Sequence, residues 1–400
     1  MLNKSTFFNR RSSGSRIRSL WGACFAHALH DGYTDQLYAL LPVWQTQFGL
    51  NYMWLAIVRA LYSGTMGGLQ VPADRCTSRW TSRWALALST LGAAIGFIVI
   101  ALPTGFAGLC VGLVLAGAGS SVQHPRASHL VTRAYGSDSR GALGIYNFAG
   151  DLGKATLPAI VAFLLPVLPW RTVVGLMGLF GILVASTLLA IVPNDAGLAS
   201  IPREVKHTRE THGGFGVLLA IGVLDTATRM GYLLFLPFLI HARGGSSATV
   251  GLGLGLLFSG GALGKATCGW LGKRIGVVWS VVATEIATAL LIAITSLASL
   301  TAMLVFLPFL GLVLNGTSSV LYGTVPELAP KGNSGRAFAV FYTGVIGSSG
   351  LAPIVYGTIA DHSNQMTGIL SSACTAMAIV PLALSLRTVF RGAGTRRTIA

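Results

Sequence analysis

Three side chains able to bind protons follow one another at one-turn spacing near the start of the chain. His27, Asp31 and Asp35 lie at i, i+4 and i+8, so a helix would place them on one face. A charged group at the centre of a membrane costs about 2.5–3.5 kcal/mol, and two carboxylates one turn apart repel each other. Both effects favour a protonated carboxyl group. The pattern predicts that these residues carry protons or contact a substrate; the alternative is that His27 and Asp35 face water near opposite ends of the helix.

Oppositely charged residues also occur together inside two later apolar stretches. Asp151 and Lys154 are at i, i+3, and Asp225 and Arg229 are at i, i+4, so each pair can interact within a helix. Either pair could belong to a transport pathway, or it could be a structural ion pair that keeps two charges from being buried alone. The sequence leaves both alternatives open.

Two isolated charges stand in other apolar stretches. Arg59 could bind an anionic substrate or pair with Asp31 or Asp35, and we expect the pairing. For Glu285 we expect structural pairing or contact with lipid headgroups rather than a part in transport.

A short polar motif follows the fourth apolar stretch. Pro125 should end the regular helix there. Its neighbours His124 and Arg126 could gate a pathway or simply face water on the cytoplasmic side.

The charged stretches belong to two copies of one sequence repeat. Residues 31–42 correspond to 225–237, since both begin with Asp and end in Leu-Pro, and residues 112–122 correspond to 311–320. Buried charge at matching places in two membrane repeats indicates a transport pathway.

The composition is that of an all-α membrane protein. Of the 400 residues, 52% are hydrophobic and only 10% are charged, whereas soluble domains have about 25% charged residues. A membrane-spanning helix needs roughly 20 apolar residues. On this basis we predict two pseudo-symmetric six-helix halves, with twelve transmembrane helices at 20–41, 52–72, 84–102, 105–123, 141–165, 171–192, 215–240, 247–269, 275–297, 300–320, 337–360 and 366–386.

The positive charge is distributed unequally between the two sides of these predicted spans. The net charge is +16, and 22 of the 28 Lys and Arg residues fall in the tails and loops of one side. This asymmetry fits the positive-inside rule with both termini in the cytoplasm of a cell inner membrane. It also explains the basic composition without nucleic-acid binding, which we do not expect.

The spans divide the chain into five parts and leave no room for a soluble domain. We predict a cytoplasmic tail (1–19), an N-terminal half (20–192), a cytoplasmic linker (193–214), a C-terminal half (215–386) and a second tail (387–400). The five cysteines are scattered without a C-x-x-C motif, which indicates apolar fillers rather than metal ligands. No hydrolase, metalloprotease or nucleotide-binding signature occurs. We therefore expect no enzyme activity, no metal and no cofactor.

Twelve spans, a six-plus-six repeat and a long central loop resemble the major facilitator superfamily. Asp74 and Arg75 after the second span are similar to its G-x-x-x-D-R-x-G-R-R signature, although the flanking glycines are missing. The corresponding loop after the eighth span has Lys273 in place of the acid, followed by Arg274. The resemblance implies that these loops take part in gating.

The same resemblance implies which helices line a central cavity. In the superfamily these are helices 1, 4, 5, 7, 8, 10 and 11, and the pseudo-symmetry relates helices 1 and 7. We accordingly expect Asp35 and Arg229 to approach each other in at least one state of a transport cycle. The further pathway candidates on these helices are Tyr146, Asn147, Asp151, Lys154 and Lys265.

A narrower resemblance covers most of the N-terminal half. Residues 117–128, 140–144 and 150–153 are similar to the fosmidomycin-resistance branch, as is His27 ahead of Asp31. That branch implies drug–proton antiport. We expect a monomeric, proton-coupled exporter of a small polar or anionic compound, whose partners are its substrate, protons and the lipid bilayer. The alternatives are a symporter that takes up an organic anion, an intramembrane enzyme that uses His27 and Asp31, and a transport-inactive receptor.

Overall fold

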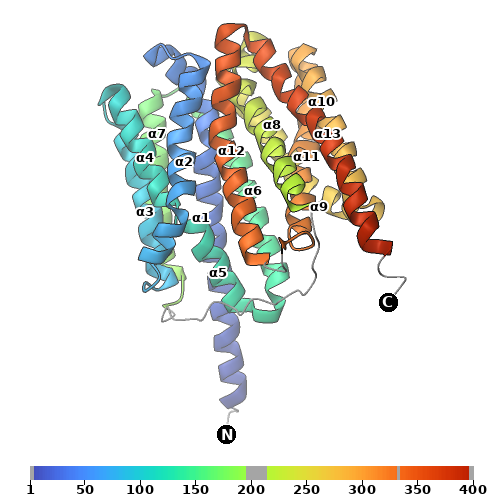
Figure 1. Cartoon of the computed structure of the whole chain (residues 1–400). Helices are drawn as coiled ribbons and strands as arrows, with labels where there is room; N and C mark the ends of the chain where they lie inside the picture. Colours follow the sequence, from blue (N-terminus) through green and yellow to red (C-terminus); the bar gives the residue numbers. More distant parts are fainter. Residues whose placement is uncertain (1–3, 195–213, 331–333, 396–400) are drawn as a thin grey trace. The chain divides into compact units, whose positions relative to one another are not determined.

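The computed structural model describes residues 4–194, 214–330 and 334–395, and in this part of the chain every regular element is a helix (Figure 1). The helices are α1 (Lys4–Phe48), α2 (Tyr52–Cys76), α3 (Ser82–Ala101), α4 (Gly105–Ser120), α5 (Gln123–Tyr135), the 3₁₀ helix η1 (Gly136–Asp138), α6 (Ser139–Leu164), α7 (Trp170–Ile191), α8 (Phe215–Ala242), α9 (Ser247–Ile275), α10 (Val277–Leu297), α11 (Leu300–Thr324), α12 (Ser334–His362) and α13 (Gln365–Thr395). Each predicted span coincides with one long helix. The all-α prediction is confirmed.

Several predicted boundaries differ from the observed ones. α1 begins at Lys4 and α13 ends at Thr395, so both expected tails are largely helical. Helices continue past the apolar spans because each added residue gains one more backbone hydrogen bond on an existing helix. Most of the predicted linker lies outside the described residues.

The prediction that Pro125 ends a helix was wrong. α4 ends at Ser120, and Pro125 is the third residue of the next helix, α5. Proline is tolerated in a first turn because the backbone N–H groups there have no partner inside the helix. α5 ends at Tyr135, and the next residue, Gly136, has φ 54°, a value that glycine adopts without steric cost.

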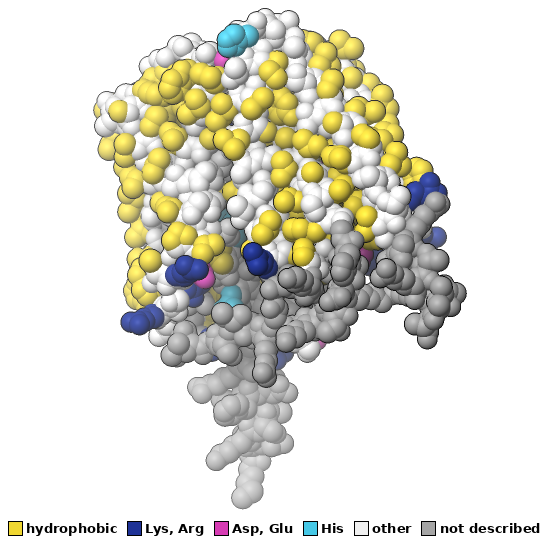
Figure 2. Space-filling model, in the orientation of Figure 1, with side chains coloured by type: hydrophobic (Ala, Val, Ile, Leu, Met, Phe, Trp, Pro, Cys, Tyr) yellow, Lys and Arg dark blue, Asp and Glu magenta, His cyan; other side chains and the backbone are white. Residues whose placement is uncertain are grey.

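Three helices differ from the others in composition. In the described residues, nine helical segments are long and apolar enough to cross a membrane by themselves; α1, α2 and α6 are not among them. These three carry most of the candidate charged residues of the N-terminal half, including Asp31, Arg59 and Lys154. Such residues are tolerated in a membrane when neighbouring helices cover them. The face in view in Figure 2 is largely hydrophobic, as contact with lipid requires.

The chain forms two compact units, which we describe separately. Unit 1 comprises residues 1–40 and 61–199, and unit 2 comprises residues 41–60 and 200–400. In unit 1, α3 packs against α4 and α7. α6 approaches α1 so closely that a Cβ atom at Gly153 would lie 1.9 Å from the backbone oxygen of Ala28. Small residues permit such contact between membrane helices.

Unit 2 is built around the same kind of contact. α9 and α11 pack most extensively, and Gly260 and Gly264 of α9 lie directly against the backbone of α11 at Pro308 and Leu312. Most of the remaining contacts join α8 to α12 and α13, and α10 to α11 and α13. These helices bury an apolar core that includes Leu218, Ile221, Phe341 and Ile379.

A carboxylate fixes the start of α2 within unit 2. Asp361, at the end of α12, accepts hydrogen bonds from the backbone N–H groups of Tyr52 and Met53, both at 2.9 Å. The Tyr52 hydroxyl donates to Gln365 at 3.2 Å. A carboxylate at a helix N-terminus satisfies unpaired N–H groups and interacts favourably with the helix dipole. Asp361 thus attaches residues 41–60 to the C-terminal helices.

Replacing Asp361 with Ala should loosen this attachment. Loss of a capping side chain costs about 1 kcal/mol, which corresponds to roughly fivefold faster opening of the affected backbone. Hydrogen–deuterium exchange of peptides covering residues 51–56 should accelerate by that factor, while peptides from α3 and α7 should not change. Asp361→Asn keeps an acceptor oxygen, so in this variant the same peptides should exchange at a rate between those of the wild type and the Ala variant. Unchanged exchange in the Ala variant would contradict this assignment.

Candidate functional site

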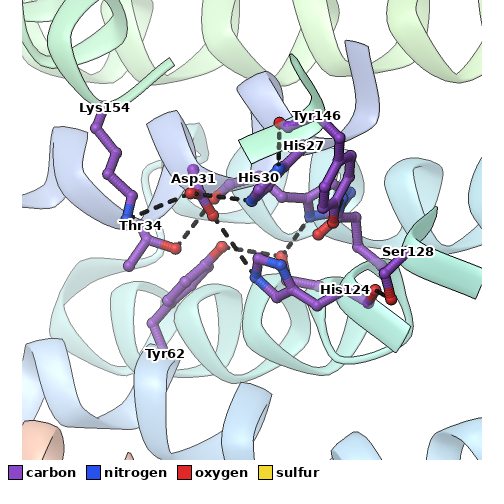
Figure 3. Close-up of polar contacts among 11 residues, drawn as sticks. His27, His30, Asp31, Thr34, Tyr62, His124, Ser128, Tyr146 and Lys154 are labelled. Atoms are coloured by element: carbon purple, nitrogen blue, oxygen red, sulfur yellow. Dashed lines mark hydrogen bonds and ion pairs between the residues drawn. The ribbon is translucent and has the colours of Figure 1, made fainter. Parts of the chain in front are cut away.

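Asp31 is the centre of a buried charged cluster in unit 1 (Figure 3). Its Oδ2 atom lies 3.2 Å from His27 Nε2 and 3.3 Å from Lys154 Nζ, and its Oδ1 atom lies 3.6 Å from His124 Nε2. Only 11% of the Asp31 side chain is exposed, compared with 31% for Lys154 and 35% for His124. One carboxylate therefore faces three groups that can carry positive charge. The two more exposed groups connect it to the surface of the unit.

Both ring nitrogens of His27 lie close to oxygen atoms. His27 Nδ1 lies 2.9 Å from the backbone oxygen of Tyr146, which can only accept, so Nδ1 carries a hydrogen. In neutral histidine the other nitrogen, Nε2, would then be an acceptor as well. Nε2 nevertheless faces a carboxylate oxygen of Asp31. Both nitrogens of His27 therefore face acceptor atoms.

A nearby histidine, His30, contacts hydroxyl groups instead of a carboxylate. His30 Nδ1 lies 2.9 Å from Ser120 Oγ, and His30 Nε2 lies 3.1 Å from Thr90 Oγ1. Each hydroxyl can donate or accept, so a neutral His30 satisfies both contacts. The hydroxyl of Tyr62 forms a further hydrogen bond with Ser120 Oγ, at 2.9 Å. We interpret His30 as a structural residue.

Helix packing positions the cluster. The His27 ring is stacked on Tyr146 with centroids 4.0 Å apart and contacts His124 edge-on at 5.2 Å. Gly150 on α6 leaves the space that His27 and Asp31 occupy, because a Cβ atom there would lie 2.7 Å from His27 Nε2 and 2.8 Å from Asp31 Oδ2. α1, α5 and α6 must therefore meet for the cluster to form.

The cluster also has the spacing of a cation site. Ligand atoms of His27, Asp31 and His124 lie within 4.8 Å of one another. The Lys154 ammonium group, however, contacts the same carboxylate. Its positive charge opposes a divalent cation at this position. Proton binding fits the charges of the cluster better.

The structure brings together some predicted residues and separates others. His27, Asp31, His124, Lys154 and Tyr146 meet, although His124 was predicted in gating and Lys154 as a partner of Asp151. No sequence pattern predicted these two contacts, because they join residues more than 90 positions apart on different helices.

Two other predicted residues of unit 1 are buried beside the cluster. Asp35 lies one turn beyond Asp31 and is 5% exposed, near enough to Tyr62 to act on its hydroxyl electrostatically. Asp151 is 7% exposed. Asn147 is exposed.

The predicted gating residues of unit 1 form an ion pair. Arg126 Nε lies 3.0 Å from Asp74 Oδ1, and the same guanidinium donates to the backbone oxygen of Asp74 at 2.9 Å. This contact ties the end of α2 to α5. Arg75 is exposed nearby.

The predicted residues of unit 2 lie in separate places. Arg59 is buried and donates to the sulfur atom of Met230 at 3.5 Å. Lys265 is half-buried, and its backbone oxygen accepts from Ser319. Lys273 is exposed, and Arg274 lies over the ring of Trp270 at 5.2 Å. These last two lie in the last turn of α9, whereas the sequence predicted them in the loop after the span.

Asp225 has an unexpected partner. Its carboxyl group is hydrogen-bonded to that of Glu285 on α10, and Arg229 acts on both by its charge. The sequence predicted only Arg229 as the partner of Asp225, and the structure adds Glu285 as a second partner. Both carboxyl groups are buried.

Comparison with known proteins identifies the family. The family model of the Major Facilitator Superfamily matches residues 20–220 and again residues 217–397. The chain belongs to the Major Facilitator Superfamily. The two matches cover the two sequence repeats, and the predicted family and fold are confirmed.

Individual members of the superfamily support the same assignment. The fosmidomycin resistance protein of Escherichia coli (strain K12) is 25% identical over 378 residues, which cover 88% of this chain and 90% of that protein. A bacterial homolog to the human lysosomal transporter Spinster has a similar fold, with a TM-score of 0.73 at 15% identity over 94% of this chain and 98% of that chain. A POT family transporter in complex with 5-aminolevulinic acid gives a TM-score of 0.72 at 13% identity, over 93% of this chain and 96% of that chain. The chain is thus a multi-pass membrane transporter of this superfamily.

Gly150 offers a test of the cluster that leaves every charged residue in place. In Gly150→Ala the new methyl group meets the ring of His27 and the carboxylate of Asp31, so both side chains must move. We expect transport to fall at least tenfold, which corresponds to about 1.4 kcal/mol, while the protein still inserts and folds. Transport assays on purified, reconstituted variants measure this.

Two glycines of the same helix provide the controls. Gly144→Ala meets nothing within 4 Å and should behave as the wild type, whereas Gly153→Ala meets the backbone of Ala28 and should lower folding yield as well as transport. Equal transport by the Gly144 and Gly150 variants would show that the arrangement around His27 is not needed.

Proposed function

We propose that this protein is a proton-coupled secondary transporter that exports a small polar or anionic compound by alternating access. The observation that carries the proposal is the contact of His27 with the buried Asp31 carboxyl group, where both His27 nitrogens face acceptor atoms and a proton can be shared. A buried carboxyl group that exchanges a proton can couple transport to a gradient.

The neighbours of Asp31 suggest how the proton is coupled to substrate binding. When Asp31 is ionised, Lys154 and the two histidines are held to it by charge. Protonation of Asp31 removes that attraction and leaves Lys154 available to an anionic substrate. Substrate and proton then bind alternately, as antiport requires.

Two observations favour export of an anion. The relative that is 25% identical over 88% of the chain is a fosmidomycin resistance protein. The cations Arg59, Lys154 and Lys265 lie within transmembrane helices, and Lys154 is close to the proposed proton site. The alternatives are uptake of an organic anion by proton symport and a receptor that does not transport.

Reconstitution separates these alternatives. Purified protein in liposomes, with an imposed pH gradient, is tested against a panel of labelled anions and drugs. Substrate movement against the direction of the proton gradient supports antiport, and movement with it supports symport. If no substrate moves and no proton flux accompanies any compound, the proposal of a proton-coupled transporter fails.

We also propose an inner-membrane location with both termini in the cytoplasm. The support is the concentration of Lys and Arg on one side of the predicted spans. With this orientation, the ion pair of Asp74 and Arg126 and the residues Arg75, Lys273 and Arg274 take part in a cytoplasmic gate. Residues 193–214 connect two six-helix halves of a monomeric transporter.

The orientation predicts a clear difference between two fusions. A reporter enzyme that works only in the cytoplasm should be active when fused after Ala400 and inactive when inserted at Thr104 in the turn between α3 and α4. Immunoblotting confirms that both fusions are present in equal amounts. An active fusion at Thr104 would overturn the orientation.

A further inference from the structure

A second pair of buried acidic residues lies in unit 2, away from the Asp31 cluster. Asp225 on α8 is 4% exposed, and Glu285 on α10 is 1% exposed. Their carboxyl groups are hydrogen-bonded to each other. An ionised carboxylate can only accept hydrogen bonds, so this contact requires one of the two groups to hold a proton as O–H.

The charges around the pair lead to the same conclusion. Arg229, one turn after Asp225, is the cation that acts on both carboxyl groups in the described part of unit 2. With one carboxyl group protonated, the remaining negative charge is balanced by Arg229. With both ionised, a net negative charge would be buried in a membrane protein, which is strongly unfavourable.

The other neighbours of the pair are uncharged. On α11, Thr317 hydrogen-bonds to Glu285, and its Oγ1 atom lies 2.8 Å from that of Thr284. Asp225 acts by its charge on Tyr322 of α11 and on Cys268 of α9. α12 and α13 also pack against α8, but among their described residues none contributes a charge that acts on the pair. The proton state of this site is therefore set by two carboxyl groups and one guanidinium.

The three helices of unit 1 that correspond to those of the pair are joined by neutral polar groups. α1, α3 and α4 of the first repeat correspond to α8, α10 and α11 of the second. In the first repeat these three helices are joined by His30, Thr90 and Ser120, whose hydrogen bonds are all satisfied by neutral groups. In the second repeat Asp225, Glu285 and Thr317 lie on the three corresponding helices.

We propose that Asp225 and Glu285 form a second proton-binding site, in which the two carboxyl groups share one proton beside Arg229. The site lies in the opposite repeat from Asp31 and goes beyond the proposed function, which uses only the Asp31 cluster. The transporter accordingly has one proton-binding carboxyl site in each repeat.

Infrared spectroscopy of the full-length protein in lipid membranes tests this directly, because a protonated carboxyl group has its own carbonyl stretching band. Glu285→Gln and Asp225→Asn should each remove one carboxyl equivalent from this band at neutral pH. In each variant a single carboxylate remains opposite Arg229, and the new amide can still donate the hydrogen bond. The double variant should remove one equivalent and no more, since the pair holds a single proton.

Other outcomes would overturn the proposal. If neither single variant changes the band at any pH at which the protein is folded, both carboxyl groups are ionised. If the double variant removes two equivalents, the pair holds two separate protons. Glu327→Gln is the matched control, since Glu327 is exposed at the end of α11 and should not contribute to the band. Asp31→Asn should not change the part of the carbonyl band that Glu285→Gln removes. The two proposed proton sites can therefore be tested independently.

Discussion

Asp31→Asn should abolish transport driven by a pH gradient. Asn is nearly the same size as Asp and still accepts hydrogen bonds from His27 and Lys154, but it cannot take up and release a proton. We expect gradient-driven transport to fall by two orders of magnitude or more, as is typical when a group that transfers protons is removed. Counterflow exchange of substrate, which needs no net proton movement, should persist.

Controls separate a lost proton from a damaged protein. Asp138→Asn makes the same chemical change at an exposed position and should transport as the wild type. Size-exclusion chromatography and counterflow show that the Asp31 variant is folded. If the Asp31→Asn variant showed gradient-driven transport equal to wild type, Asp31 would not be the residue that couples proton movement to transport. The candidates would then be Asp151 and the Asp225 site.

Lys154→Met should be both unstable and inactive, because it leaves the Asp31 carboxylate buried without its fixed positive partner. Leaving a buried polar group unpaired costs about 1–3 kcal/mol, and more for a charge. Lys154 is partly exposed, so we expect the lower part of that range. Thermal unfolding of the purified variant measures the loss.

The double variant Asp31→Asn/Lys154→Met distinguishes stability from function. It removes both charges, so thermal stability should return close to the wild-type value while gradient-driven transport stays absent. A double-mutant cycle on stability then gives the coupling between the two residues. Zero coupling would show that the 3.3 Å contact contributes nothing in the membrane.

The amino-acid sequence determined the fold class and the central residue of the site. Most of the spans can be recognised without a structure, because the bilayer requires continuous apolar helices, and the sequence repeat indicates the remaining ones in spite of their charges. Charge inside such stretches is rare enough to single out Asp31, Lys154 and Asp225. The periodicity of α1 also placed His27 and Asp31 on one face, and they are in contact.

The tertiary structure decided which of these charges meet. Lys154 pairs with Asp31, His124 lies close to the same carboxylate, and Glu285 contacts Asp225. Helical spacing relates only residues within a few turns of one helix. Contacts between helices depend on close approach at glycines such as Gly150 and Gly153, whose neighbours across the helix interface the sequence does not show. The two proposed proton sites therefore depend on helix packing, although their residues can be recognised in the sequence.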